Sequence, residues 1–247
     1  MLEITVIGNG NLGTALATAI NNVKDFKLLE WYGRTWDNDN LPVKAITKLI
    51  KLKNADLYIL AVSDNSINKI LDSIDTDFFV IHCSGATSID IFKNHPRSGV
   101  LFPIQTISKT NGIFFKHTPF CIEAKHETDL EILKKLVLAL EGSYELLNSV
   151  QRANLHLSAV WVNNFVNHMI FKGKKICTDN NIPFSLLKPI LKKTINQALI
   201  NNPKNIQTGP ARRDDKETLE IHSQLINNLN DKKLYEIITK SIQNSYE

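Results

Sequence analysis

Short apolar runs alternate with segments of helical periodicity over the first part of the chain. The runs at residues 3–7, 26–32, 55–62 and 78–82 are typical of buried strands, and shorter extended segments follow at 99–103, 118–124 and 144–147. Between them, apolar positions recur at helical spacing over 12–20, 43–52 and 130–140. This alternation predicts an α/β fold with a doubly wound, mostly parallel sheet of Rossmann type.

The strand signals stop after residue 148, and the remaining pattern is helical. Helices are predicted over 151–180, 185–201, 214–229 and 231–245, separated at Pro183 and at the Gly209-Pro210 turn. The chain is therefore expected to hold a dinucleotide-binding Rossmann domain, 1–148, and an all-helical C-terminal domain, 149–247. A helical second domain usually supplies a wall of a substrate cleft and a dimer surface, by analogy between folds.

Composition narrows the classes of function. The 247 residues are 43% hydrophobic, enough for a sizeable core, yet no run of about eighteen apolar residues could span a membrane. The N-terminal MLEITVIG has no basic segment and no cleavage site of a secretory signal, so a cytoplasmic location is expected. The net charge is only +4 and the lysines are scattered, which argues against nucleic acid and for a small-molecule substrate.

The three cysteines, Cys83, Cys121 and Cys177, are far apart in the sequence and form no CxxC pair. Neither a metal site nor a disulfide framework is indicated. We expect all three to be small buried hydrophobes.

The segment Gly8-Asn9-Gly10-Asn11-Leu12-Gly13 fits G-x-G-x-x-G directly after a strand and at the start of a helix. Gly8 permits the tight turn, Gly10 lets a pyrophosphate approach the backbone, and Gly13 lets the helix pack on the sheet. The helix N-terminus offers free N–H groups to the phosphates. This context predicts a dinucleotide site; the alternative is a glycine-rich turn that binds nothing.

The end of the second predicted strand bears on the choice of cofactor. NAD-preferring domains place an acid there for the ribose 2′-hydroxyl, but here the chain reads Tyr32-Gly33-Arg34-Thr35. Arg34 can pair with a 2′-phosphate and Thr35 can donate to it, which favours NADP(H) over NAD(H). Two alternatives stay open: Arg34 as a solvated turn residue, and Asp37 or Asp39 turning towards a ribose.

These residues together resemble the superfamily of β-hydroxyacid dehydrogenase and 6-phosphogluconate dehydrogenase, which includes pyrroline-5-carboxylate reductase and ketopantoate reductase. The resemblance covers essentially the whole chain and rests on GNGNLGTALA (8–17), GRT (33–35), ADLYILAVSDNSI (55–67) and HCSGATSID (82–90). The segments FPIQTIS (102–108), NSVQRANLHLSAVWVNNFVNH (148–168) and QTGPARRDD (207–215) resemble a functionally uncharacterised, NADP-oxidoreductase-like bacterial subfamily within it.

The resemblance carries implications for particular residues. It implies that Ala61, Val62 and Ser63 lie along the cofactor ribose and pyrophosphate, and that Ser84 and Gly85 lie beside the nicotinamide where relatives hold substrate. It also implies a homodimer joined through the helical domain. Those dehydrogenases use a Lys followed four residues later by an Asn; aligning Asn164 with that Asn places Val160 at the Lys position, so the usual acid/base group is absent.

His156 is the candidate replacement. On a regular helix, at roughly 100° per residue, His156, Val160, Asn163 and Asn167 fall within about 60° of one another. The residues of a second, apolar stripe are expected to face the core: Leu155, Ala159, Val162, Val166 and Met169. His156 could then act as general acid, while the amides of Asn163, Asn164 or Asn167 orient a carbonyl or imine. The alternative is a surface or hydrogen-bonded histidine.

Other polar residues have two open interpretations each. Ser84 is a candidate beside the cofactor but not a nucleophile, since no GxSxG elbow surrounds it. Gln105 and Thr106 could face substrate or form plain loop. Arg212, with Arg213, could clamp a carboxylate or phosphate, or the pair could be solvated arginines that bridge to Asp214, Asp215 and Glu217.

Three functions follow from these features. The first is an NADP(H)-dependent oxidoreductase that moves hydride to or from a small, anionic carbonyl, hydroxy or imine substrate. The second is a dinucleotide-binding sensor or interaction protein without turnover, a function that the absence of the Lys favours. The third, electron exchange between a deazaflavin and NADP, needs a wider cleft than the sequence can demonstrate.

Overall fold

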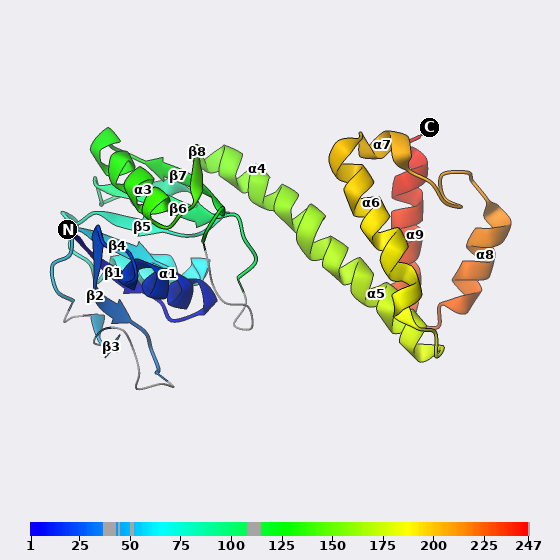
Figure 1. Ribbon diagram of the computed structural model, residues 1–247, viewed down its shortest axis with the longest axis horizontal. Helices are drawn as coiled ribbons and strands as arrows, with labels where there is room; N and C mark the ends of the chain where they lie inside the picture. The colour runs from blue at the N-terminus through cyan, green and yellow to red at the C-terminus, as the bar shows by residue number, and fades with distance from the viewer. Residues whose placement is uncertain (37–42, 44, 50–51, 108–114, 247) are drawn as a thin grey trace. The chain divides into compact units, whose positions relative to one another are not determined.

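The structure is a computed structural model that describes residues 1–36, 43, 45–49, 52–107 and 115–246 (Figure 1). The chain packs as two compact units, Met1–His168 and Met169–Glu247. The last strand ends at Leu146 and the first long helix begins at Ser149, whereas the compact units divide after His168. The domain boundary at 148/149 therefore stays a prediction.

Within the described residues, the first unit holds one eight-stranded sheet in the order β3-β2-β1-β4-β5-β6-β7-β8. All neighbours are parallel except β6 and β7, which are antiparallel. The strands are β1 (Leu2–Ile7), β2 (Phe26–Tyr32), β3 (Ala45–Ile46), β4 (Leu57–Leu60), β5 (Val80–His82), β6 (Ser98–Pro103), β7 (Pro119–Ala124) and β8 (Ser143–Leu146). The predicted Rossmann-type sheet is confirmed.

The side chains of the central strands alternate between two buried faces. Ile4 and Val6 belong to a core that α1 (Asn11–Asn21) and α3 (Glu127–Ala139) cover, as Figure 1 shows. Ile7 and Tyr58 belong to a second core, on the opposite face, with α2 (Ile67–Leu71). Near-continuous apolar runs in the sequence arise because both faces of these strands are covered.

The connections from β1 and β4 leave the sheet towards opposite faces. The chain goes from β1 into α1 on one face, and from β4 into the 3-10 turn η2 (Asp64–Ser66) and α2 on the other. Because β1 and β4 are neighbours, their carboxyl ends flank the switch point of the sheet. In open α/β sheets, ligands bind in the crevice at this point.

The other helical elements of the described chain include 3-10, π-helical and α-helical segments. Their bounds are η3 (Ile89–Ile91), α4 (Ser149–Ala159), η4 (Val160–Phe165), α5 (Val166–Asp179), η5 (Phe184–Leu187), α6 (Lys188–Ile200), α7 (Pro203–Ile206), α8 (Lys216–Leu225) and α9 (Leu229–Asn244). A capping box starts α4: the Asn148 side chain accepts from Gln151 N, and the Gln151 side chain accepts from Asn148 N. In the second unit, Lys172 and Asp231 form an ion pair of 2.6 Å that joins α5 to α9.

Two expectations about helices are wrong. In the described part of 43–52 the chain forms the short strand β3, because the free edge of β2 pairs with it at Trp31 and Tyr32. The helix expected without interruption over 151–180 contains a π-helical segment, η4. Its i→i+5 hydrogen bonding adds a residue to the turn, so angular positions worked out for a regular helix fail beyond residue 159.

The apolar stripe expected to face the core is not buried there, because every residue from 161 to 169 is exposed. Val162 is 73% exposed, and Val166 and Met169 are also exposed. By contrast, the three cysteines are buried thiols without disulfides, as expected. No helix in the described ranges is both long enough and apolar enough to cross a membrane.

Candidate functional site

The glycine turn after β1 is packed tightly against neighbouring backbone. Gly8 has φ +124°, and a Cβ there would lie 2.1 Å from the Ala61 carbonyl oxygen. A Cβ at Gly13 would lie 2.1 Å from the Gly8 oxygen, so helix α1 can approach the turn only with glycine at that position. These contacts fix the turn between the ends of β1 and β4.

Gly10 differs from Gly8 and Gly13. It has φ −72°, caps the N-terminus of α1, and a Cβ there would meet no atom within 4 Å. The first turn of α1 contains no acidic residue. The open side of Gly10 and the free N–H groups of α1 thus present a positive helix end that an anion could approach without meeting a side chain or carboxylate.

The side chains of Asn9 and Asn11 stabilise this turn through hydrogen bonds to neighbouring backbone. The Asn9 amide donates to the Thr35 carbonyl, and the Asn11 amide donates to the Ile107 carbonyl at 3.1 Å. Leu12 packs against the core. If these three residues hold a phosphate, the groups available for it are their backbone N–H groups.

Arg34 and Thr35 follow β2 and are both exposed. Among the residues that the structure describes, no carboxylate lies within ion-pair distance of Arg34. Asp37 and Asp39, the alternative partners for a ribose, lie outside the described residues. The acid within β2, Glu30, is buried and accepts a 2.8 Å hydrogen bond from Lys53 N.

The segment after β4 lines the other side of the switch point. Ala61 N donates to Ile7 O at 2.8 Å, which extends the β1–β4 ladder to the turn. Val62 is partly buried and Ser63 is exposed, with its hydroxyl 2.8 Å from that of Ser66. The predicted cofactor segment 61–63 therefore adjoins Gly8.

The loop after β5 is held by local hydrogen bonds. Ser84 is buried, its Oγ accepts from Ala86 N at 3.2 Å and from Thr87 N at 2.9 Å, and its own N–H donates to His82 Nδ1 at 3.1 Å. Ser84 therefore shapes the loop that presents Gly85.

Two neighbouring groups are uncharged at neutral pH. Burial, assisted by the Arg152 guanidinium and opposed by a Ser88 backbone hydrogen bond, lowers the pKa of His82 to about 4. Burial raises the pKa of the Cys83 thiol to about 12. Both side chains are therefore neutral, and Cys83 lacks the thiolate that a reactive cysteine needs.

The structure brings His156 of α4 onto this loop. A Cβ on Gly85 would lie 2.8 Å from His156 Cγ and 2.8 Å from Phe102 Cζ. The Phe102 and His156 rings meet edge-on, 5.6 Å apart. In the described part of the chain no hydrogen bond engages the imidazole nitrogens, so they remain able to exchange a proton with a ligand.

Asn163 and Asn164 of η4 and Asn167 of α5 are exposed. Asn163 Nδ2 donates to Thr106 Oγ1 at 2.8 Å, whereas no hydrogen bond joins the side chain of Asn164 or Asn167 to the loop at Gly85 within the described ranges. Gln105 accepts a 3.1 Å bond from Thr118 Oγ1. Thr106 thus lies beside the predicted site helix.

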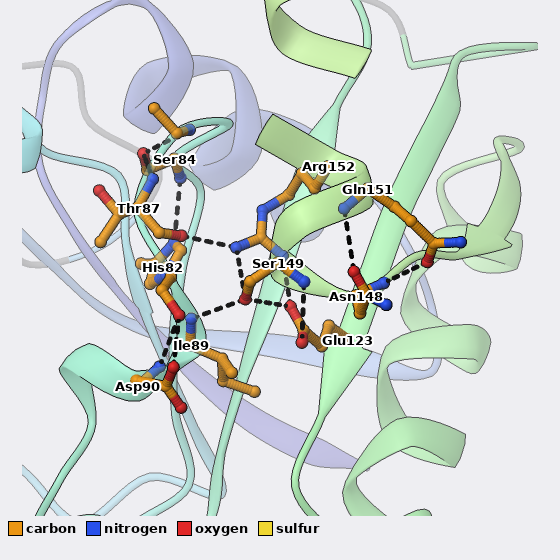
Figure 2. Close-up of polar contacts among 12 residues, drawn as sticks. His82, Ser84, Thr87, Ile89, Asp90, Glu123, Asn148, Ser149, Gln151 and Arg152 are labelled. Atoms are coloured by element: carbon orange, nitrogen blue, oxygen red, sulfur yellow. Dashed lines mark hydrogen bonds and ion pairs between the residues drawn. The ribbon is translucent and has the colours of Figure 1, made fainter. Parts of the chain in front are cut away.

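A buried ion pair that the sequence pattern did not predict adjoins this loop (Figure 2). Arg152 of α4 is fully buried and pairs with Glu123 of β7. One signal was available: Glu123 interrupts an otherwise apolar strand, and a charge at such a position requires a partner.

Arg212 belongs to the second unit. Its guanidinium lies over the Tyr246 ring, 4.1 Å from the centroid, and Arg213 is 3.8 Å from Asp215. Arg213 therefore follows the bridging alternative, whereas Arg212 stays a predicted anion-binding residue. No group of three or more His, Cys, Asp or Glu side chains in the described residues is placed to hold a metal ion.

Residues 118–242 match the family described as Domain of unknown function (DUF2520). A search of curated proteins finds no match to the chain. Among solved structures, a candidate NADP oxidoreductase from Bacteroides fragilis is 31% identical; the alignment covers 98% of each chain with a TM-score of 0.87.

Two further structures are more distant. A protein from Thermotoga maritima is 20% identical over 98% of each chain, with a TM-score of 0.69. Plasmodium falciparum pyrroline carboxylate reductase, solved with NADP bound, is 16% identical over 100% of this chain and 98% of that one, with a TM-score of 0.59. These two show the fold alone.

The resemblance in fold to Rossmann-like NADP oxidoreductases and pyrroline-5-carboxylate reductases is thus confirmed. The family match spans half of the chain, and the Bacteroides relative aligns over nearly all of it. The chain belongs to the DUF2520 family.

Proposed function

We propose that this protein is an NADP(H)-dependent oxidoreductase that acts on a small, anionic carbonyl, hydroxy or imine compound. The proposal rests on a contrast within the glycine turn. Backbone atoms occupy the space that a side chain at Gly8 or Gly13 would need, whereas the corresponding space at Gly10, at the N-terminus of α1, is empty. An open glycine at a helix N-terminus, beside the switch point of the sheet, fits a pyrophosphate.

The residues around the turn fit the rest of the cofactor. Exposed Arg34 would pair with a 2′-phosphate, Thr35 would add a donor, and the backbone of 61–63 would follow the ribose. NADP is also the cofactor in the description of the Bacteroides relative and in the Plasmodium reductase structure. When bound, NADP(H) supplies or accepts the hydride.

His156 is the group proposed to move the proton. Reduction of a carbonyl or imine adds hydride to carbon and a proton to oxygen or nitrogen, and a histidine imidazole is a common donor of such a proton. Gly85 and Phe102 hold the ring while leaving its nitrogens unbonded in the described structure. Asn163, Asn164 and Asn167 are the proposed groups that orient substrate.

Titration calorimetry tests the cofactor assignment. Wild type should bind NADPH more tightly than NADH, Arg34→Ala should lose that preference, and Gly10→Val should bind neither. Lys24→Ala is the matched control, because Lys24 is an exposed cation at the other end of β2. Failure of wild type to bind either nucleotide would refute the proposal.

A binding protein without turnover is the second candidate. One observation favours it: Val160 begins η4 at the position where the resemblance calls for a Lys. Substrate-dependent oxidation of NADPH at 340 nm by wild type, abolished in His156→Gln with NADPH affinity unchanged, would dismiss this candidate. Tight NADPH binding with no turnover on any tested ketone, ketoacid or cyclic imine would favour it.

We also propose that the protein forms a homodimer through its helical unit. Large apolar side chains are exposed there on α5, α6 and α9, among them Ile176 (56%), Ile190 (63%) and Ile237 (67%). Exposed apolar surface on this scale usually marks a protein interface. Sedimentation velocity at micromolar concentration should give a species of twice the 27.9 kDa chain mass, and a monomer would refute this proposal.

A further inference from the structure

Arg152 is a fully buried guanidinium that contacts three separate segments (Figure 2). One terminal nitrogen, Nη1, donates to Glu123 of β7. The other, Nη2, donates to the Thr87 carbonyl at 2.6 Å and to Ser149 Oγ at 3.2 Å. A single side chain therefore ties β7, the start of α4 and the loop after β5 together.

Ser149 completes the junction. Its N–H and Oγ donate to the Glu123 carboxylate at 3.1 and 2.8 Å, and its Oγ accepts from Ile89 N at 2.9 Å. The first turn of α4 is thus bound both to the sheet and to the segment that follows the loop, as Figure 2 shows.

The same loop carries the groups of the proposed site. Arg152 holds Thr87 by its carbonyl, Thr87 N donates to Ser84 Oγ at 2.9 Å, and Ser84 precedes Gly85. Arg152 and His156 are four residues apart on α4, so they lie on one face of the helix. The guanidinium and the imidazole therefore meet opposite ends of the segment 85–87.

Stability alone is a weak reason for such a pair. Removing two charges from water is costly, and proteins in which well-packed apolar residues replace such a pair are often at least as stable. Geometry gives a better reason for the presence of this pair. The planar guanidinium fixes the direction of its hydrogen bonds as well as their length.

We propose that Arg152 is a positioning residue, which sets the register between α4 and the loop 84–87 so that the His156 ring lies on Gly85 and Phe102. The inference rests on the role proposed for His156. It concerns the placement of that ring, which can be measured without substrate or cofactor.

Nuclear magnetic resonance of the histidine ring protons provides the test. Phe102 lies edge-on to His156, so the ring current of each shifts the protons of the other; His156→Gln assigns the signal and Phe102→Leu calibrates the shift. Arg152→Lys keeps the charge but cannot span Glu123, Ser149 and Thr87. In this variant, the His156 signals should lose most of the ring-current shift.

The double variant Arg152→Met/Glu123→Gln removes both charges together and avoids an unpaired buried ion. It should give the same loss while its circular dichroism stays that of a folded protein. Arg97→Met/Asp129→Asn is the matched control, since it removes a different pair, one whose carboxylate is fully buried. This control should leave the His156 signals in place.

Unchanged His156 signals in folded Arg152→Lys would overturn the inference and leave Arg152 as a stabilising residue only. If the double variant does not fold, Arg152→Lys decides alone. A wild-type protein that fails to bind NADPH would refute the proposed function, yet the ring-current measurement would still report whether Arg152 positions His156.

Discussion

The imidazole of His156 meets the ring of Phe102 edge-on, with an interplanar angle of 87°. Gly85 lies against both rings, and a Cβ there would come within 2.8 Å of each. Glycine is required at position 85 by space rather than by backbone conformation. Gly85 is therefore a point of close packing between the loop after β5 and the helix α4.

Gly85→Ala is therefore expected to destabilise the protein by about 1 to 3 kcal/mol through overpacking. Urea unfolding measures the effect. Phe102→Leu removes the ring edge that the new methyl group would meet, so the double variant Gly85→Ala/Phe102→Leu should be more stable than the sum of the two single changes predicts. Strict additivity would contradict the packing.

The glycines of the turn separate folding from binding. Gly10→Ala adds a methyl group in open space at an ordinary φ, so its expected cost is that of a less favourable N-cap residue, about 0.5 to 1 kcal/mol. Gly13→Ala forces a Cβ onto the Gly8 carbonyl and should lower the free energy of unfolding by about 1 to 3 kcal/mol.

Calorimetry with NADPH completes this comparison. Gly10→Ala should weaken binding although the fold is intact, because its methyl group stands where the pyrophosphate approaches the backbone. If Gly10→Ala unfolds as readily as Gly13→Ala, the open side of Gly10 is filled by protein and cannot receive a phosphate.

The sheet was predictable from sequence because its signal is local. Strands buried on both faces are apolar runs, and a glycine motif between a strand and a helix identifies β1 and α1. The strand β3 was not predictable in this way. It has only two residues, too few to show a hydrophobic period, and it forms because the edge of β2 is free to pair with it.

The site was predictable only in part, for physical reasons. His156 and Gly85 were both singled out, and they lie together in the structure. The π-helical η4 has no sequence signature comparable to a cap, so the helical angles assigned to Asn163 and Asn167 were wrong. The bond from Arg152 to the Thr87 carbonyl joins residues 65 apart, and no periodicity reports such a contact.

Gly173 gives a test within the helical unit. It lies inside α5, and a Cβ there would meet no atom within 4 Å. Alanine has the higher helix propensity, so Gly173→Ala should stabilise the protein by about 0.5 to 1 kcal/mol in thermal or urea unfolding. Destabilisation at high protein concentration only would show that this face is covered when chains associate.

His82 should make the protein sensitive to mild acid. Its pKa is about 4 in the folded state, chiefly because of burial, against about 6.5 in an unfolded chain. Between these values the unfolded state binds more protons, so the free energy of unfolding falls as pH decreases from about 6.5 to 4. The loss attributable to His82 approaches about 3 kcal/mol at pH 4, and this group adds no pH dependence above about pH 7.

Urea unfolding between pH 4.5 and 8 measures this dependence, with His82→Asn as the matched variant. The Asn carbonyl can still accept the hydrogen bond from Ser84 N but takes up no proton. Burial also lowers the pKa of His95, which adds a slope of the same sign. His82→Asn should therefore reduce the pH dependence without removing it, and an unchanged slope would mean that His82 is not the neutral, buried imidazole that stacks on Phe92.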